Sequence, residues 1–192
     1  MNQQVPIAVQ PGKHLFTHRE ALRLWETDFF NGRRFELLNG EVYLMPMEGF
    51  LHQGLRERLL ASLYRHFFLT DLPLIAGSNG PIRLGEHQAP EPDVYVRPAG
   101  LALDQVGGEE TLLVIEICVS TQEKDFKIKP QIYAAHGVRE FWLIEPEAAR
   151  TVVRRGPRPD GSWAQEWAVP AGERIEALLV QGFAMTLAEL LG

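Results

Sequence analysis

Apolar residues recur along the chain with two different periods, and these periods predict helices and strands. Thr17 has the capping-box spacing to Glu20, and the sequence ALRLWETDFF that follows has helical spacing, so we expect a helix over residues 17–30. A leucine or phenylalanine recurs every fourth residue across residues 50–68, which predicts a long amphipathic helix. His52 falls within the apolar arc of that helix, and we expect its imidazole to face inward.

Between these two helices, the sequence RFELLNGEVYLM has two strand-like runs around Asn39 and Gly40. An Asn-Gly pair suits the positive φ angles of a tight hairpin turn, so we expect a β-hairpin here. Shorter extended segments are expected around residues 72–76, 81–84 and 93–97, because turn-forming sequences separate them.

The sequence TLLVIEICV, residues 111–119, is an almost unbroken apolar run and predicts a central strand covered on both faces. A helix that ends near Gly137 and a strand over residues 139–145 follow it, and this order predicts a crossover unit. A hairpin over residues 151–169 and a short helix over residues 186–191 complete the pattern. We therefore expect an α/β (α+β) protein with an N-terminal helix and hairpin.

Length and composition fit one soluble globular domain. The chain has 192 residues, of which 45% are hydrophobic and 23% are charged. We expect residues 1–16 to be a flexible N-terminal segment and residues 17–192 to be a single domain. Cys118 is the only cysteine, which fits a reducing compartment, and no signal peptide or membrane span is recognisable. These features predict a cytoplasmic protein that does not bind a membrane.

A net charge of −6 argues against sequence-blind adhesion to nucleic acid, because such binding comes from neutralising phosphates with lysine and arginine. Local charge is a separate matter. Arg33 and Arg34 are adjacent, and the sequence RRGPR occupies residues 154–158. One interpretation is that these arginines surround an acidic centre. Surface arginines that promote solubility explain the same groups.

Glu116 lies inside the predicted central strand. An isolated ionised carboxylate is costly there unless it is paired, protonated or bound to a metal. A structural ion pair with a lysine or arginine and a functional role both meet this requirement, so Glu116 alone leaves both open.

Asp93 follows a proline in the sequence PEPDVYV, at the start of a predicted strand. If this strand is a neighbour of the Glu116 strand, both carboxylates meet near one end of the sheet. Mg²⁺ takes one or two carboxylates and keeps its other positions for water and phosphate oxygens. The two residues therefore predict a Mg²⁺ site, with Mn²⁺ as a substitute, although a turn aspartate after proline also explains Asp93 alone.

Three of the four lysines of the chain fall within the sequence KDFKIKP, residues 124–130. Asp125, Lys129 and Tyr133 are spaced i, i+4 and i+8, so they share one face of the helix that follows the Glu116 strand. From that face Lys129 can approach the carboxylate pair, orient a water molecule or neutralise charge that develops on phosphorus. A solvated charge run near a helix start is the alternative.

Four motifs, in this order, resemble the Uma-two family of restriction-endonuclease-like proteins in the PD-(D/E)XK nuclease superfamily. They are RRFELLNGEVYLM, PEPDVYV, VIEICVST with KDFKIK, and IYAAHGVREFWLIE, and the resemblance runs from about residue 17 to residue 155. It implies a restriction-endonuclease-like mixed β-sheet flanked by helices and a metal-dependent phosphodiesterase centre. It also implies that Asp93 and Glu116 are metal ligands and that Lys129 is the catalytic lysine.

The chain departs from the broader superfamily at one position. There the lysine lies two residues beyond the acid on the same strand, and Cys118 holds that position here. Uma-two proteins move the lysine to a helix, which makes Lys129 the candidate. Cys118 is not expected to be a nucleophile, because a lone cysteine in an apolar strand is usually inert.

The resemblance implies further residues around this centre. Glu36 is expected as an additional catalytic acid and metal ligand, and Glu41, on the other arm of the hairpin, is the weaker choice. Without the resemblance, both are explained as solvent-facing hairpin charges. The family motif carries a histidine at His52, which we expect beside the metal ligands or the substrate, together with Asp125 and Tyr133.

Three hypotheses follow for the function. The first is an Mg²⁺-dependent endonuclease that hydrolyses DNA phosphodiester bonds. The second is a non-catalytic nucleic-acid- or protein-binding module that retains the nuclease fold, and the third is a structural dimer with a buried ion cluster. A single domain that cuts both strands of a duplex needs two centres, so we also expect a homodimer.

Overall fold

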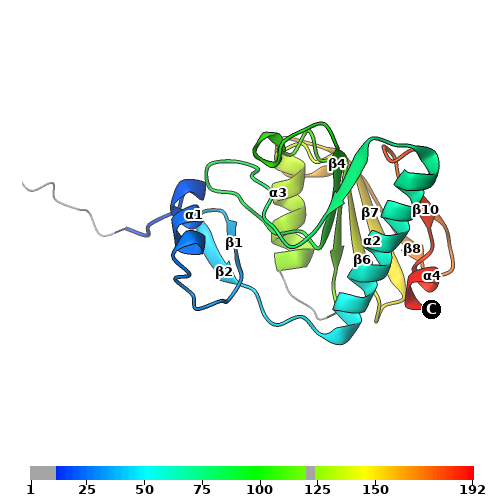
Figure 1. Ribbon diagram of the computed structural model, residues 1–192, viewed down its shortest axis with the longest axis horizontal. Helices are drawn as coiled ribbons and strands as arrows, with labels where there is room; N and C mark the ends of the chain where they lie inside the picture. Colours follow the sequence, from blue (N-terminus) through cyan, green and yellow to red (C-terminus); the bar gives the residue numbers. More distant parts are fainter. Residues whose placement is uncertain (1–11, 120–123) are drawn as a thin grey trace, which may run out of the picture.

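A six-stranded mixed sheet forms the centre of the computed structural model, which describes residues 12–119 and 124–192 (Figure 1). Its strands lie in the order β3-β4-β5-β6-β7-β8. The pair β5-β6 is parallel and every other pair is antiparallel. The strands are β3 (Leu74–Gly77), β4 (Val94–Pro98), β5 (Leu113–Ile117), β6 (Glu140–Glu145), β7 (Arg150–Pro157) and β8 (Trp163–Pro170). The expected mixed sheet is therefore confirmed.

The central strand β5 is buried at every position, as its unbroken apolar sequence predicts. Because β5 and β6 run parallel, the chain must cross over the sheet between them. The described part of this crossover is the π-helical turn η2 (Lys124–Ile128) and the helix α3 (Lys129–Ala135). Pro130 lies in the first turn of α3, where proline is tolerated.

Two helices cover opposite faces of the sheet (Figure 1). The long helix α2 (Phe50–Thr70) packs its apolar stripe on one face, with residues from alternate positions of β4 and β5. Helix α3 packs on the other face through Tyr133. The short helix α4 (Leu187–Leu191) and the small strands β9 (Ile175–Glu176) and β10 (Ala184–Met185) extend the core under α2. Glu116 alternates with Ile115 and Ile117 along β5, and so it faces α3.

The N-terminal part consists of helix α1 (His18–Glu26) and the hairpin of β1 (Phe35–Leu38) and β2 (Glu41–Leu44). The predicted capping box at Thr17 is present. Trp25 stacks on Phe35, with ring centroids 4.6 Å apart, and this contact joins α1 to the hairpin. A bridge between Leu37 and Ala89 ties the hairpin to the segment that leads into β4. Glu36 is thereby held next to that segment.

Two expectations about elements are corrected by the structure. The first helix ends at Glu26 and does not reach residue 30, because Asp28 and Asn31 adopt positive φ angles that stop a right-handed helix. Residues 81–84 form no ladder strand; they run irregularly into an isolated bridge between Gly85 and Gln88. Among the described helices, α2 included, no segment combines the length and apolar character that a membrane span needs.

Gly40 gives a test of the hairpin that carries Glu36. Its φ angle is +75°, and a Cβ atom there would lie 2.7 Å from the Cβ atom of Leu15. We expect Gly40→Ala to lower the free energy of unfolding by about 2 kcal/mol, because the left-handed conformation and the overlap both disfavour alanine. Denaturant titration measures this change.

Gly54, inside α2, is the matched control. A Cβ atom there meets nothing within 4 Å. Gly54→Ala should raise the free energy of unfolding by about 1 kcal/mol through helix propensity alone. An equal effect of both substitutions would contradict the assigned geometry at Gly40.

Candidate active site

The ammonium group of Lys129 joins acidic groups from distant parts of the chain. Its Nζ atom lies 2.7 Å from Glu116 Oε1 and 3.3 Å from Glu36 Oε2, and it donates a hydrogen bond of 3.0 Å to the carbonyl oxygen of Glu91. All three charged side chains are at most 3% exposed. The amide of Glu91 also donates to Glu36 Oε2 at 3.2 Å. Strands β1 and β5, helix α3 and the approach to β4 therefore meet at one ammonium group.

Tyr133 also contacts Glu116. It lies one helical turn after Lys129, and its hydroxyl donates to Glu116 Oε1 at 2.7 Å. Burial raises the pKa of Tyr133 well above 10, and the neighbouring charge of Glu116 adds to the increase. The tyrosine therefore stays a protonated donor at neutral pH. Lys129 and Tyr133 approach Glu116 from the same helical face, as their i, i+4 spacing predicts.

Asp93 lies directly before β4, opposite Glu116 of the neighbouring strand β5. Val94 pairs with Ile115 in the antiparallel register, and the amide of Ile117 donates to Asp93 Oδ2 at 2.6 Å. His52 Nε2 lies 3.1 Å from the same oxygen. The two predicted carboxylates thus come from neighbouring strands, at the same end of the sheet.

The carboxyl group of Asp93 is held in its charged form. Burial alone raises its pKa, but the hydrogen bond and charge of His52, the charge of Lys129 and the amide of Ile117 outweigh burial. The pKa of Asp93 therefore lies below its ordinary value. A carboxylate that stays ionised while buried is a suitable ligand for a hard cation.

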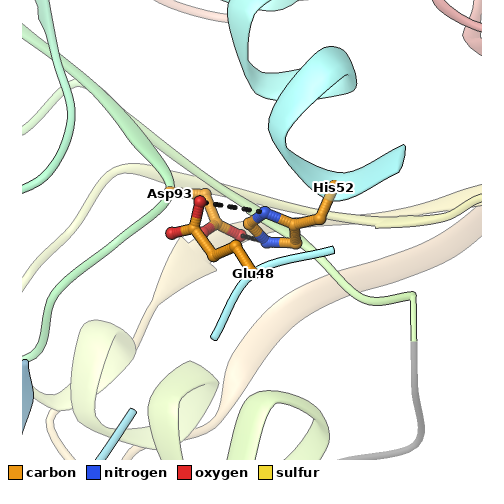
Figure 2. A group of neighbouring side chains, drawn as sticks. All are labelled: Glu48, His52 and Asp93. Atoms are coloured by element: carbon orange, nitrogen blue, oxygen red, sulfur yellow. Dashed lines mark hydrogen bonds and ion pairs between the residues drawn. The ribbon is translucent and has the colours of Figure 1, made fainter. Parts of the chain in front are cut away.

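Figure 2 shows the imidazole of His52 with the carboxylates of Asp93 and Glu48 turned toward it. The distance from His52 Nδ1 to Glu48 Oε2 is 3.8 Å, and one ligand atom from each of the three residues lies within 4.8 Å of the others. Burial lowers the pKa of His52, but Asp93 and then Glu48 raise it above its ordinary value. We call these three residues the His52 group. They share no residue with the Lys129 group, which consists of Lys129, Glu116, Glu36 and Tyr133.

Two arginines border the His52 group. Arg34 and Arg56 both form ion pairs with Glu48, and Arg34 also pairs with the side chain of Glu91. Arg34, Arg56 and Glu91 line a pocket of about 580 Å³ together with Trp25. The arginines therefore place positive charge at the edge of the acidic centre.

The remaining predicted site residues are not brought to this centre. Glu41 is at the surface of the hairpin, where it pairs with Lys13 and accepts a hydrogen bond of 3.0 Å from Tyr43. The side chain of Asp125 lies outside the described residues. Cys118 is a buried cysteine directly after β5.

Glu48 and Glu91 were not anticipated from the sequence. Glu48 precedes His52 by four residues, and this i, i+4 spacing of a carboxylate and an imidazole is a usable signal. Glu91 lies two residues before Asp93 in PEPD. Both residues lie in loops without a hydrophobic period, which is why the pattern of the chain did not mark them.

Comparison with known proteins identifies the family. The model of the Uma2 family, described as "Putative restriction endonuclease", matches residues 19–188. The chain belongs to the Uma2 family. This membership confirms the resemblance of the four sequence motifs and supports a nuclease-like function.

The fold of this Uma2 protein recurs in a solved structure. That structure is described as a "putative nuclease belonging to DUF820" from Anabaena variabilis ATCC 29413; its TM-score is 0.73, and the match covers 91% of this chain and 97% of that chain. Sequence identity is 18%, so this likeness shows the fold alone. A search of curated proteins gave no match.

Lys129→Met tests whether the buried ion pairs of Lys129 with Glu116 and Glu36 stabilise this Uma2 protein. Removal of the ammonium leaves Glu116 and Glu36 buried without their shared cation, and we expect the free energy of unfolding to fall by about 3–5 kcal/mol. Tyr133→Phe removes one hydrogen bond to a charged group and should cost about 1.5–3 kcal/mol.

Lys127 is exposed and provides the control. Lys127→Met should change the free energy of unfolding by no more than about 1 kcal/mol, because an exposed charge contributes little to stability. Denaturant titrations in a metal-free buffer compare the three variants. Equal losses in Lys129→Met and Lys127→Met would show that the buried ion group does not stabilise the fold.

The pair of His52 and Asp93 predicts a pH dependence. Since folding raises the pKa of His52, its contribution to stability is fully present below pH 6.5 and is lost as the pH rises through the higher pKa of the folded state. The difference in unfolding free energy between wild type and His52→Gln should therefore be largest at acidic pH and vanish at alkaline pH. After screening by solvent it should reach at most about 1 kcal/mol.

His66→Gln, on the same helix, is the control, because His66 bonds to the carbonyl oxygen of Gln181 and not to a carboxylate. Thermal melting between pH 5 and pH 9 measures both differences, and His66→Gln should not reproduce the profile of His52→Gln. A difference for His52→Gln that grows with rising pH would contradict the assignment.

Proposed function

We propose that this Uma2 protein is an endonuclease that hydrolyses DNA phosphodiester bonds with Mg²⁺, or with Mn²⁺ as a substitute. The observations that carry this proposal are the strand register, which places Asp93 opposite Glu116, and the ammonium of Lys129, which lies 2.7 Å from Glu116. Carboxylates that hold a divalent cation and a nearby ammonium are the parts that phosphodiester hydrolysis requires. Membership of the Uma2 family supports the same conclusion.

The residues fit a divalent cation. Asp93 keeps a charged carboxylate with a lowered pKa, and its side chain is 11% exposed, so an ion can reach it. Glu116 and Glu36 add two carboxylates that both contact the ammonium of Lys129. We assign Asp93, Glu116 and Glu36 to the metal centre on this basis, because carboxylate oxygens are the ligands that Mg²⁺ and Mn²⁺ take.

The side chains of the protein have distinct parts in the reaction. When bound, the divalent cation polarises the phosphoryl group and lowers the pKa of a bound water. Tyr133 and Lys129 fix the orientation of Glu116 through their contacts with Oε1. The fixed charge of Lys129 also offsets negative charge that develops on the phosphorus, and it requires no reorganisation during the reaction.

Positive charge near the centre fits a nucleic-acid substrate in spite of the net charge of −6. Arg34 and Arg56 border the His52 group and line the adjacent pocket. Such local cations contact phosphates even in an acidic protein.

We further propose a homodimer, because cleavage of both strands of a duplex needs two active centres. Light scattering that gives the mass of one chain would contradict this proposal.

One observation favours a second interpretation. Lys129 is 2% exposed, as a purely structural ion cluster in a non-catalytic module requires. In that case the centre stabilises the fold and gives no cleavage with any metal. The two interpretations differ in their response to conservative substitution of Asp93.

Nicking of supercoiled plasmid with Mg²⁺ or Mn²⁺ tests the proposal. Wild type should nick the plasmid, and Asp93→Asn and Glu116→Gln should lower the rate by about 10²-fold or more, as expected when a charged group that stabilises the reaction is removed. Glu41→Gln, on the surface of the hairpin, should keep the wild-type rate.

Thermal melting without metal confirms that each variant is folded. A wild type without any cleavage favours the non-catalytic module. Cleavage that persists at the full rate in both Asp93→Asn and Glu116→Gln requires these residues to be withdrawn from the site.

A further inference from the structure

The His52 group is the more open side of the acidic centre. The side chains of His52, Asp93 and Glu48 are 16%, 11% and 21% exposed, whereas the charged side chains around Lys129 are at most 3% exposed. An ion and a phosphate group that come from solvent therefore reach Asp93 from the side of His52.

One buried nitrogen atom of His52 makes no hydrogen bond within the described residues. This atom is Nδ1, which lies 3.8 Å from Glu48 Oε2. A buried polar atom without a partner requires an explanation. A metal-ligating histidine almost always donates its second ring N–H to a carboxylate or carbonyl, and Glu48 is placed to accept from Nδ1.

Glu48 is better suited to orient the ring than to bind the ion. Arg34 pairs with its Oε1 atom and Arg56 pairs with its Oε2 atom, so both carboxylate oxygens already face a cation. The Nε2 atom of His52 instead points at Asp93, at a distance of 3.1 Å. Nε2 of the ring thus faces Asp93, the proposed metal ligand, and Nδ1 faces the carboxylate of Glu48.

We propose that His52 is itself a metal ligand, with Nε2 and Asp93 binding the same divalent cation while Glu48 orients the ring from the side of Nδ1. This inference rests on the proposed function, which assigns a cation to Asp93, and it adds a nitrogen ligand to an otherwise carboxylate site. Imidazole nitrogen is a ligand for transition metals, and Mn²⁺ is a transition metal that also takes the carboxylate ligands suited to Mg²⁺ and Ca²⁺. The site should therefore bind Mn²⁺ more tightly than Mg²⁺.

Mn²⁺ alone serves as the probe. Electron paramagnetic resonance of free Mn²⁺ gives the dissociation constant, and pulsed measurements on bound Mn²⁺ detect a coordinated ¹⁴N nucleus. Wild type should bind Mn²⁺ and show ¹⁴N modulation. His52→Gln should bind it about 10-fold to 100-fold more weakly and lose the modulation, while His66→Gln, on the same helix, should match wild type.

Glu48→Ala separates orientation from ligation. If Glu48 only positions the ring, this variant should weaken Mn²⁺ binding by about 10-fold yet keep the ¹⁴N modulation. Selective ¹⁵N labelling of histidine in the wild-type protein should replace the ¹⁴N pattern with that of ¹⁵N. This measurement needs no substitution, so it tests the inference even if His52→Gln does not fold.

Two outcomes would overturn the inference in different ways. Tight Mn²⁺ binding without histidine nitrogen modulation, or modulation that survives in His52→Gln, removes His52 from the ligand set and leaves the proposed nuclease function standing. Absence of Mn²⁺ binding at millimolar concentration removes both the inference and the metal-dependent function.

Discussion

The buried ammonium group of Lys129 is the interaction on which the arrangement of this centre depends. It lies within 3.3 Å of carboxylates from β1 and β5, and it donates to the backbone before β4. Two carboxylates without a cation would be expensive to bury at this depth. The position of Lys129 at the start of α3 therefore fixes how the hairpin, the central strand and the crossover helix meet.

Asp93 stands in a different environment, although it is directly opposite Glu116. Its charge is maintained by His52 and by the backbone amide of Ile117, and it is more exposed than the glutamates. The centre thus has a closed interior around Lys129 and a more open side around His52. This division fits a site in which the interior fixes the positions of the charged side chains and the open side receives the ion and the substrate.

Much of this centre was predictable from local patterns in the sequence. The apolar run around Glu116 identified a central strand, and helical spacing placed Lys129 and Tyr133 on the face that contacts it. The position of Asp93 opposite Glu116 followed from two short neighbouring strands. These inferences succeeded because strand burial and helix periodicity are local properties of the chain.

Other contacts depend on tertiary packing that no local pattern encodes. Glu36 was expected only through the family resemblance, since its hairpin looks like a surface hairpin until Leu37 bridges to Ala89. Glu48 and Glu91 lie in loops, and their ion pairs with Arg34 join residues far apart in the sequence. Glu41 has the same residue type and lies on the same hairpin as Glu36, yet it is at the surface. The bridge from Leu37 to Ala89 covers the β1 arm, which is buried at every position, whereas the β2 arm that carries Glu41 is partly exposed.

The central claim is that this group of charges is a metal centre built on Asp93. The most direct test is an anomalous difference map from a crystal soaked in Mn²⁺. A peak is expected within coordination distance of Asp93, at the end of the sheet where Asp93 lies opposite Glu116, with Lys129 still paired to Glu116. A fully soaked crystal without a peak at Asp93, and with the same ion pairs around Lys129, would contradict the account and leave a structural ion cluster in its place.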